Sequence, residues 1–211
     1  MSPILVLVDH HDGAVRKSTT ELLTIARRLG DPVAVVIGHG AGQVRAAMQD
    51  EPVTFVEQAE QLGTGHALQQ CLDTITPGND VLVLVGDAPL IRADTLHQLV
   101  DQRGDAVVSV LSFIPANNYG YGRIARADSG NVRAIVEQKD TTADEAEIRE
   151  CNSGILLIDG ARVRELVMAL ENNNAQQEYY LTDVVALAVA RGDSVTAVVC
   201  EDADEVNGIN N

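Results

Sequence analysis

A carboxylate follows one of the most apolar stretches of the chain. The stretch VLVLVGDAPLI ends its aliphatic run at Val85 and continues with Gly86 and Asp87. In an open α/β sheet, a carboxylate at the carboxyl end of a central strand commonly holds Mg²⁺ beside the phosphates of a nucleotide. The alternative is that Asp87 caps the turn after the strand. Residue type and place favour a magnesium ligand.

A glycine-containing segment, FVEQAEQLGTGHALQQ, is the second candidate. Here Gln58 follows an apolar run, and Gly63, Thr64 and Gly65 precede an amphipathic pattern. Glycines let backbone N–H groups approach a ligand closely, and a Gln side chain pairs with donor and acceptor edges of a base. An ordinary helix N-cap at Thr64 explains the same spacing equally well. His66 is more typical of a packing or capping residue than of a catalyst.

Polar clusters also stand at both ends of the chain. The run DHHDG, from Asp9 to Gly13, follows the first apolar run, a place where phosphates often bind. Adjacent residues on an extended chain point to opposite faces, so four in a row rarely converge on one metal ion. We therefore interpret this turn as scaffold. The terminal EVNGINN offers Asn207, Asn210 and Asn211 as oxygen ligands, or forms only a solvated tail.

Apolar runs alternate with amphipathic patterns along most of the chain, and these elements must position the candidate residues. Strands are expected at 4–8, 32–37, 52–56, 80–85, 106–111, 154–158 and 194–199. Helices are expected at 18–29, 41–48, 64–75, 93–102, 161–170 and 182–190. The alternation predicts an α/β fold with a mostly parallel sheet covered on both faces. Residues 122–139, GRIARADSGNVRAIVEQK, predict a small β-hairpin insertion.

Composition limits the partners. The 211 residues are 45% hydrophobic, enough for one core, so we expect a single domain over 1–211. A net charge of −16 disfavours nucleic acid but leaves a small anionic ligand possible where a divalent cation assists. No apolar run is long enough for a membrane span and no secretory signal precedes the first run, so a cytoplasmic protein without membrane contact is expected. Three distant cysteines indicate reduced thiols, and the oligomeric state is not indicated.

Seven motifs become specific when they are taken together. They are QAEQLGTGHA, GDAPL, GYGRI, IVEQKD, NSGI, NNNAQQEYYLTD and EVNGINN. In this order and at about these spacings, residues 37–211 resemble the uridyltransferase domain of the bifunctional N-acetylglucosamine-1-phosphate uridyltransferase and glucosamine-1-phosphate acetyltransferase family. The resemblance implies a Rossmann-like nucleotidyltransferase sheet. It also implies Mg²⁺ and an in-line attack by the phosphate oxygen of N-acetylglucosamine-1-phosphate on the α-phosphorus of UTP, with pyrophosphate leaving.

The same resemblance implies roles for individual residues. Nucleotide contacts are implied at five positions: Gln58, Gly63 and Thr64 at uracil, and Gly86 and Asp87 at the ribose and phosphates. Sugar contacts are implied at Gly122, Glu137 and Asn152. The metal ligands are implied to be Asp87 and Asn210.

Residues 1–36 depart from that family. They contain no L-x-x-G-x-G-T-R-M loop and no later P-K, and they resemble instead the amino terminus of the electron-transfer flavoprotein alpha subunit. The chain thus resembles a chimera of two families. Arg16 and Lys17, just before a capping serine at Ser18, are an alternative source of phosphate contacts. The chain ends directly after its last motif, so an acetyltransferase β-helix domain is not expected.

The missing loop leaves two main functions open. The first is a Mg²⁺-dependent uridyltransferase that makes UDP-N-acetylglucosamine. The second is a module that binds UDP-sugars without turnover, because the lost loop would supply phosphate contacts of about 1.5 to 3 kcal/mol each. A flavin-linked electron carrier is a third possibility, although the cofactor-binding part of that family lies far beyond the matching stretch.

Overall fold

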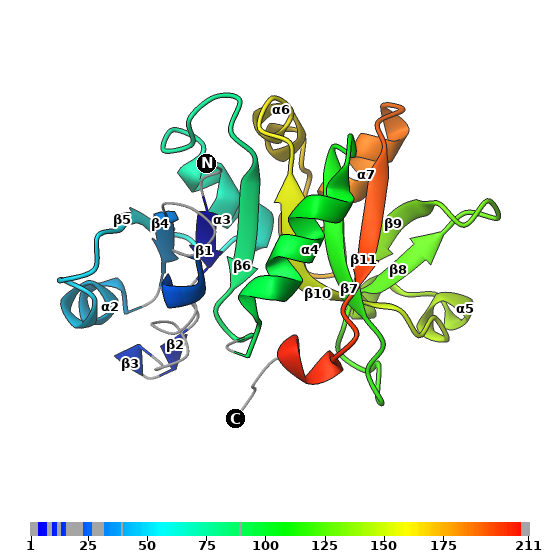
Figure 1. The fold of residues 1–211 in the computed structure, drawn as a ribbon, viewed down its shortest axis with the longest axis horizontal. Coiled ribbons are helices and arrows are strands. Elements are labelled where there is room, and N and C mark those ends of the chain that lie inside the picture. The colour runs from blue at the N-terminus through cyan, green and yellow to red at the C-terminus, as the bar shows by residue number, and fades with distance from the viewer. Residues whose placement is uncertain are drawn as a thin grey trace.

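A nine-stranded sheet forms the centre of the fold. The computed structural model describes residues 4–7, 10–11, 14–15, 23–26, 32–38, 40–88 and 90–207. Within these ranges, seven strands lie side by side in the order β11-β7-β10-β6-β1-β4-β5 (Figure 1). Their bounds are β1 Ile4–Leu7, β4 Pro32–Ile37, β5 Thr54–Glu57, β6 Val81–Val85, β7 Val108–Phe113, β10 Cys151–Ile158 and β11 Val195–Val199. This is the α/β, mostly parallel sheet of the Rossmann-like type that the sequence predicts.

Strand β10 runs against its neighbours. The pairs β1–β4, β1–β6, β4–β5 and β7–β11 are parallel, whereas β10 is antiparallel to both β6 and β7. The reversal brings the start of β10 to the edge of the sheet where β6 and β7 end. Residues at the start of β10 and residues that follow β6 therefore share one edge.

Helices connect most of the strands. Their bounds are α2 Ala41–Ala47, α3 Thr64–Cys71, α4 Ala93–Arg103, α5 Ala143–Ala146, α6 Val163–Met168 and α7 Asp183–Ala190, and residues 23–26 are also helical. Two 3₁₀ turns cover η1 Gln138–Asp140 and η2 Ala203–Glu205. The predicted helix 64–75 ends early, at Cys71, because the hydroxyl and the backbone N–H of Thr74 both bond to the carbonyl of Cys71, and Pro77 follows.

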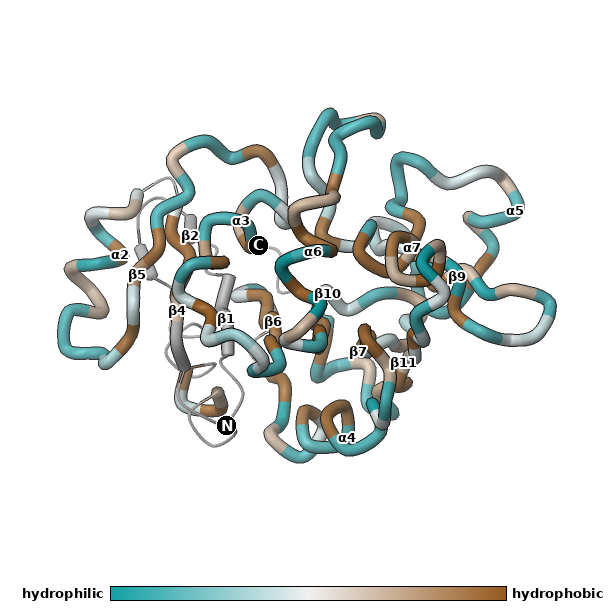
Figure 2. The backbone as a smooth tube through the Cα atoms, turned by 90° about the horizontal axis from the view of Figure 1, so that it is seen from above, coloured by the Kyte–Doolittle hydropathy of each residue, from teal (hydrophilic) through white to brown (hydrophobic). Residues whose placement is uncertain are grey.

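Both faces of the sheet are buried, as a continuous aliphatic strand requires. Side chains alternate across a strand, so Val81 and Val83 join one apolar cluster while Leu82 and Leu84 join the other. Helices α3, α6 and α7 cover the first face, and α2, α4 and residues 23–26 cover the second. Figure 2 shows α4 on the opposite side of the strands from α3, α6 and α7.

The predicted β-hairpin is confirmed. It consists of β8 Arg123–Arg126 and β9 Val132–Val136, which pair antiparallel. In the turn, the N–H of Ala127 donates to the carbonyl of Asn131 and the N–H of Gly130 donates to the carbonyl of Ala127. Gly130 adopts a φ of 86°, which favours glycine. β8 also pairs with the start of β10 at Cys151, so the hairpin extends the edge of the sheet described above.

The amino-terminal segment has a small sheet of its own. Residues His10–His11 (β2) pair antiparallel with Ala14–Val15 (β3). Our interpretation of the DHHDG run as scaffold, and not as one metal site, stays a prediction. Asp9, Arg16 and the predicted cap at Ser18 lie outside the described residues. Among the described residues, no helix has the length and apolar character that crossing a membrane requires.

Candidate functional site

A polar cavity of about 230 Å³ lies at the edge of the sheet shared by β6 and β10. Its lining comes from five separate segments of the chain: Val85, Asp87, Gly120, Tyr121, Gly122, Glu137, Asn152, Ser153, Gly154 and Val206. Four residues for which the sequence implied ligand contacts, Asp87, Gly122, Glu137 and Asn152, thus meet in one cavity, although 65 positions separate the first from the last. Gly86 is buried in the turn just before Asp87.

The antiparallel direction of β10 explains how Asn152 reaches this cavity. Asn152 pairs with Ser112 near the end of β7, and its backbone N–H donates to the carbonyl of Gly122 at 2.8 Å. Its side-chain Oδ1 accepts a bond from the N–H of Gly154 at 3.1 Å. Gly154 has a φ of 85°, and a Cβ there would lie 3.0 Å from Cγ1 of Val85. A glycine is needed at 154 for both reasons.

Glu137 enters the cavity from the end of β9. Its Oε1 accepts a hydrogen bond of 2.8 Å from the hydroxyl of Thr182, at the start of α7. Burial raises the pKa of Glu137; the Thr182 hydrogen bond acts in the opposite direction, and the charge of Asp140 adds to the rise. A Cβ on Gly122 would approach Oε2 of Glu137 to 3.3 Å, so the glycine leaves room for this carboxylate.

A buried arginine supports the wall of the cavity formed by residues 120–122. Arg123 is 2% exposed, and its guanidinium donates to the carbonyl of Tyr121 and, at 2.9 Å, to Oε1 of Gln138. The same Oε1 accepts the N–H of Gly120 at 3.1 Å. Tyr121 also packs edge-on against Phe113, with ring centroids 4.9 Å apart. This wall is therefore held from within the protein, independently of any ligand.

The residues implied at uracil form a second group at the same edge of the sheet. Gln58 directly follows β5, and Gly63 and Thr64 lie in and directly after the turn before α3. β5 is parallel to β4, β4 to β1 and β1 to β6, so β5 and β6 end at the same edge of the sheet. Gln58 is 9% exposed; its Nε2 donates to the carbonyl of Gly63 at 3.0 Å and lies 3.0 Å from Nδ1 of His66. None of these residues lines the polar cavity. His66 serves as a hydrogen-bonded packing residue.

The glycines of this second group permit a close backbone approach. A Cβ on Gly63, whose φ is 107°, would lie 2.6 Å from the carbonyl oxygen of Tyr179, and one on Gly65 would lie 2.8 Å from the same atom. The N–H of Gly65 donates to that carbonyl at 2.7 Å. Thr64 is not the N-cap of α3: the cap is Gly63, and the Thr64 hydroxyl accepts the N–H of Leu181 at 3.1 Å.

Residues 178–182 join the two groups. Tyr179 bonds to the backbone on both sides of the Gly63 turn, Leu181 bonds to Thr64, and Thr182 bonds to Glu137 in the cavity. This segment stands within the motif NNNAQQEYYLTD, for which the resemblance implied no role of an individual residue. The glycines at 63 and 65 thus have a packing role that the sequence did not reveal.

The structure places only one of the two predicted metal ligands. Asp87 lines the cavity and is mostly buried, whereas Asn210 lies outside the described residues. In the described part of the chain, no group of three or more His, Cys, Asp and Glu side chains is arranged to hold a metal ion. Mg²⁺ at nucleotide sites usually takes one or two protein carboxylates, with phosphate oxygens and water supplying the rest. The polar cavity has two acidic side chains, Asp87 and Glu137, which fits that pattern.

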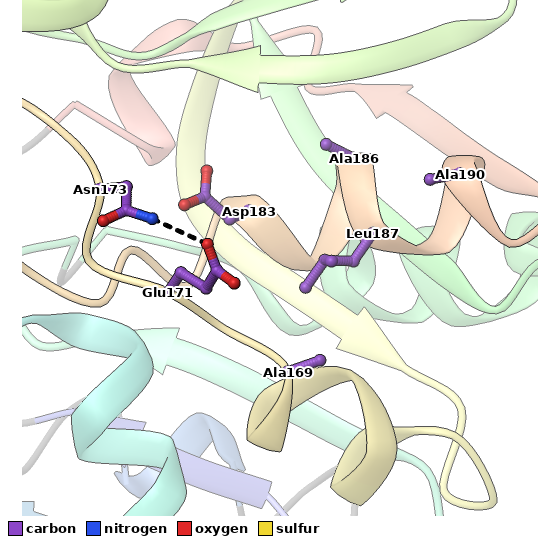
Figure 3. A pocket seen from close by; sticks show the side chains of 7 residues that line it. All are labelled: Ala169, Glu171, Asn173, Asp183, Ala186, Leu187 and Ala190. Carbon is purple, nitrogen blue, oxygen red and sulfur yellow. Dashed lines mark hydrogen bonds between the residues drawn. The ribbon is translucent and has the colours of Figure 1, made fainter.

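A larger hollow, of about 470 Å³, lies between α6 and α7 and contains none of the predicted site residues (Figure 3). Leu187 and Ala169 face each other across it, and Glu171 accepts a 2.8 Å bond from Asn173. Burial raises the pKa of Asp183, at its rim, to about 6, and the charges of Glu137 and Asp140 add to this rise. Despite its smaller size, the polar cavity at Asp87 holds four of the predicted site residues and offers side-chain donors and acceptors to a ligand.

Six lining residues of the polar cavity had no predicted role: Val85, Gly120, Tyr121, Ser153, Gly154 and Val206. Gly120 and Tyr121 stand inside GYGRI, and Ser153 and Gly154 stand inside NSGI, beside residues to which the resemblance gave a role. Val206 stands inside EVNGINN. Position within a recognised motif was thus an available signal for all of them except Val85, which directly precedes GDAPL.

Comparisons with known proteins agree with this arrangement. Residues 16–145 match the family described as MobA-like NTP transferase domain. The bifunctional protein GlmU of Marinobacter nauticus is 45% identical over 202 residues, which are 95% of this chain and 44% of that protein. The GlmU proteins of Stutzerimonas stutzeri and Burkholderia multivorans are 49% and 45% identical over 84% and 95% of this chain, and 39% and 44% of their own lengths. The chain spans about two fifths of these relatives. The resemblance of residues 1–36 to a flavoprotein subunit stays a prediction.

Proposed function

Because this chain belongs to the family of MobA-like NTP transferase domains, we propose that it is a Mg²⁺-dependent uridyltransferase, which transfers the uridylyl group of UTP to N-acetylglucosamine-1-phosphate and releases pyrophosphate. The relatives named GlmU and the seven motifs support this choice of substrates. The observation that carries the proposal is the cavity in which Asp87, Gly122, Glu137 and Asn152 meet.

The sugar end of the cavity has groups of both hydrogen-bonding kinds. Glu137 presents a carboxylate whose Oε1 is already oriented by Thr182, which leaves Oε2 to accept from a sugar hydroxyl. The Asn152 side chain offers an amide NH₂ while its Oδ1 holds Gly154. A ring with hydroxyl and acetamido groups presents matching donors and acceptors, so these residues would orient the sugar 1-phosphate for attack.

The phosphate end requires a cation. Two acidic side chains, Asp87 and Glu137, line the cavity, and the chain has a net charge of −16, so a triphosphate would be repelled without a counter-charge. When Mg²⁺ is bound, it neutralises phosphate charge and orients the phosphates for in-line displacement. Asp87 and Asn210 would hold it. The protein needs no nucleophile of its own, because the sugar phosphate oxygen attacks the α-phosphorus directly.

Pyrophosphate release tests the proposal. The assay contains folded protein, UTP, N-acetylglucosamine-1-phosphate and Mg²⁺, and we expect release that requires both substrates. Release from UTP alone, without dependence on the sugar phosphate, would contradict the proposed reaction. Glucose-1-phosphate as the alternative acceptor checks whether the acetamido group is recognised at the Asn152 end of the cavity.

Binding without turnover is the second candidate, and one observation favours it. Residues 1–36 contain neither the glycine-rich loop of the uridyltransferases nor its Arg and Lys. Three missing charge-assisted contacts, at about 1.5 to 3 kcal/mol each, would cost about three to six powers of ten in rate if they act in the transition state. A protein that releases no pyrophosphate but melts at a higher temperature with UDP-N-acetylglucosamine would establish this second function.

A further inference from the structure

Glu205 joins the carboxyl-terminal part of the chain to the start of α4. It is 4% exposed, and its Oε2 accepts the backbone N–H of Arg92 at 3.2 Å and the hydroxyl of Thr95 at 2.6 Å. Its Oε1 pairs with the guanidinium of Arg92. Figure 1 shows η2, which ends at Glu205, beside the first turn of α4. More than 100 residues separate the two partners in sequence.

This contact supplies what the start of α4 lacks. Arg92 is the N-cap of α4, and no side chain near it in sequence caps the helix. Free N–H groups and the helix dipole make this end electropositive, so a carboxylate is favourable there. Bonds to an ionised acceptor are also stronger than those between neutral groups. Glu205 thus caps α4 from the other end of the chain.

The two chain segments that this contact joins both carry residues that line the polar cavity. The segment before α4 carries Asp87, five positions ahead of Arg92, and the residue after Glu205 is Val206, which lines the cavity with Asp87. Val206 is 1% exposed, so this part of the carboxyl-terminal segment is packed into the wall of the cavity. The carboxyl-terminal segment and the Asp87 segment therefore depend on one buried carboxylate for their relative placement.

We propose that Glu205 is a positioning residue for the phosphate and metal end of the site: by capping α4 it sets the carboxyl-terminal segment against Asp87. The inference rests on the function proposed above. A buried ionic contact is a weak source of stability, since apolar residues of similar volume often stabilise as much. The Glu205 contact differs from apolar packing because its hydrogen bonds are directional, so they fix how the carboxyl-terminal segment and the start of α4 lie against each other.

Binding of UDP-N-acetylglucosamine, measured by calorimetry with Mg²⁺ and again with EDTA, tests the role without relying on turnover. We expect Glu205→Ala to lose about tenfold in affinity with Mg²⁺ and to change by less than about twofold in EDTA. Glu205→Gln keeps an acceptor oxygen for Arg92 N–H and Thr95, so we expect a loss of only about two- to threefold. Thr95→Val, which keeps the shape and removes one donor, is a second route if Glu205→Ala does not fold.

The matched control is Glu201→Gln. Glu201 is an exposed carboxylate that lines, with Arg92, Thr95 and Glu205, a hollow of about 310 Å³ at the start of α4, and its substitution makes the same change in charge. Its affinity should equal that of the wild type in both buffers. If all Glu205 and Thr95 variants lower the free energy of unfolding but bind as the wild type does, Glu205 is only a structural anchor and the inference is wrong. A wild-type protein that binds no nucleotide sugar in either buffer would contradict the proposed function itself.

Discussion

The hydroxyl of Thr182 donates a hydrogen bond to Oε1 of Glu137 at 2.8 Å, and this bond links α7 to the end of the hairpin strand β9. It orients the one carboxylate that enters the polar cavity from the hairpin. It also opposes the effect of burial, which raises the pKa of Glu137. A single hydroxyl thereby orients a residue implied to bind the sugar and partly offsets the rise in its pKa that burial causes.

Replacing that hydroxyl should change the titration of Glu137. In Thr182→Val the donor is lost while the shape is kept, so we expect the pKa of Glu137 to rise further. Carboxyl ¹³C NMR over a pH series measures this directly. Thr182→Ser keeps the hydroxyl and should titrate like the wild type. An unchanged Glu137 titration in Thr182→Val would show that the bond does not form in solution.

Asp183, the next residue along α7, should make stability depend on pH. Burial raises its pKa from 3.8 to about 6. Between about pH 4 and 6 the Asp183 carboxyl is therefore protonated in the folded protein and ionised in the unfolded chain. This contribution to stability is present below about pH 4 and is lost as the pH rises through 6. Asp183→Asn should therefore unfold at higher urea than the wild type at about pH 8, by roughly 1 kcal/mol after solvent screening.

At about pH 4, where wild-type Asp183 is protonated, the difference should disappear. Asp101→Asn, on the exposed face of α4, removes the same charge without the burial and is the control at both pH values. Equal stabilisation by both substitutions at about pH 8 would mean that the net charge of the chain, and not the site of Asp183, is responsible.

The elements of the fold and the mostly parallel course of its sheet were largely predictable, whereas the reversed direction of β10 was not. Buried strands and helix faces need apolar residues at regular positions, so these elements can be recognised in a sequence. The aliphatic run VLVLV and the spacing of apolar residues in 93–102 are examples. The reversal of one strand leaves no such regular pattern, so the antiparallel course of β10 could not be predicted from its sequence. The short helix α5 was missed although its capping box, Thr142 with Glu145, was legible in TTADE.

The candidate site, like the fold, could be predicted only in part from local sequence patterns. Asp87 could be proposed from its place after a strand, but Glu137 and Asn152 came from the family resemblance, because no local rule connects them. Contacts across long sequence separations, such as Thr182 with Glu137 and Glu205 with Thr95, depend on packing that a single sequence does not reveal. The Gly63–Gly65 spacing was legible, yet its packing reason, the Tyr179 carbonyl, stands more than 100 positions away.

The close approach at Gly65 should be costly to disturb. A Cβ there would lie 2.5 Å from Cδ1 of Leu170 and 2.8 Å from the Tyr179 carbonyl oxygen, which is backbone and has little freedom to move. We expect Gly65→Ala to lower the free energy of unfolding by about 1 to 3 kcal/mol in urea titrations. Gly42→Ala, in α2 with no atom within 4 Å of the new Cβ, should instead raise it by about 0.5 to 1 kcal/mol. Two substitutions with the same effect would contradict the packing role of Gly65.

The metal assignment predicts that nucleotide affinity depends on two residues only when a divalent cation is present. Asp87→Asn removes the carboxylate and keeps the shape, so affinity for UTP should fall by about tenfold in Mg²⁺ and stay within about twofold in EDTA. We expect the same pattern for Asn210→Ala, because an amide oxygen is a weaker but sufficient Mg²⁺ ligand. Asp128→Asn, exposed in the hairpin turn, controls for the change in net charge. If both variants bind UTP as the wild type does in Mg²⁺, the cation is held elsewhere, and the choice of Asp87 as its ligand is wrong.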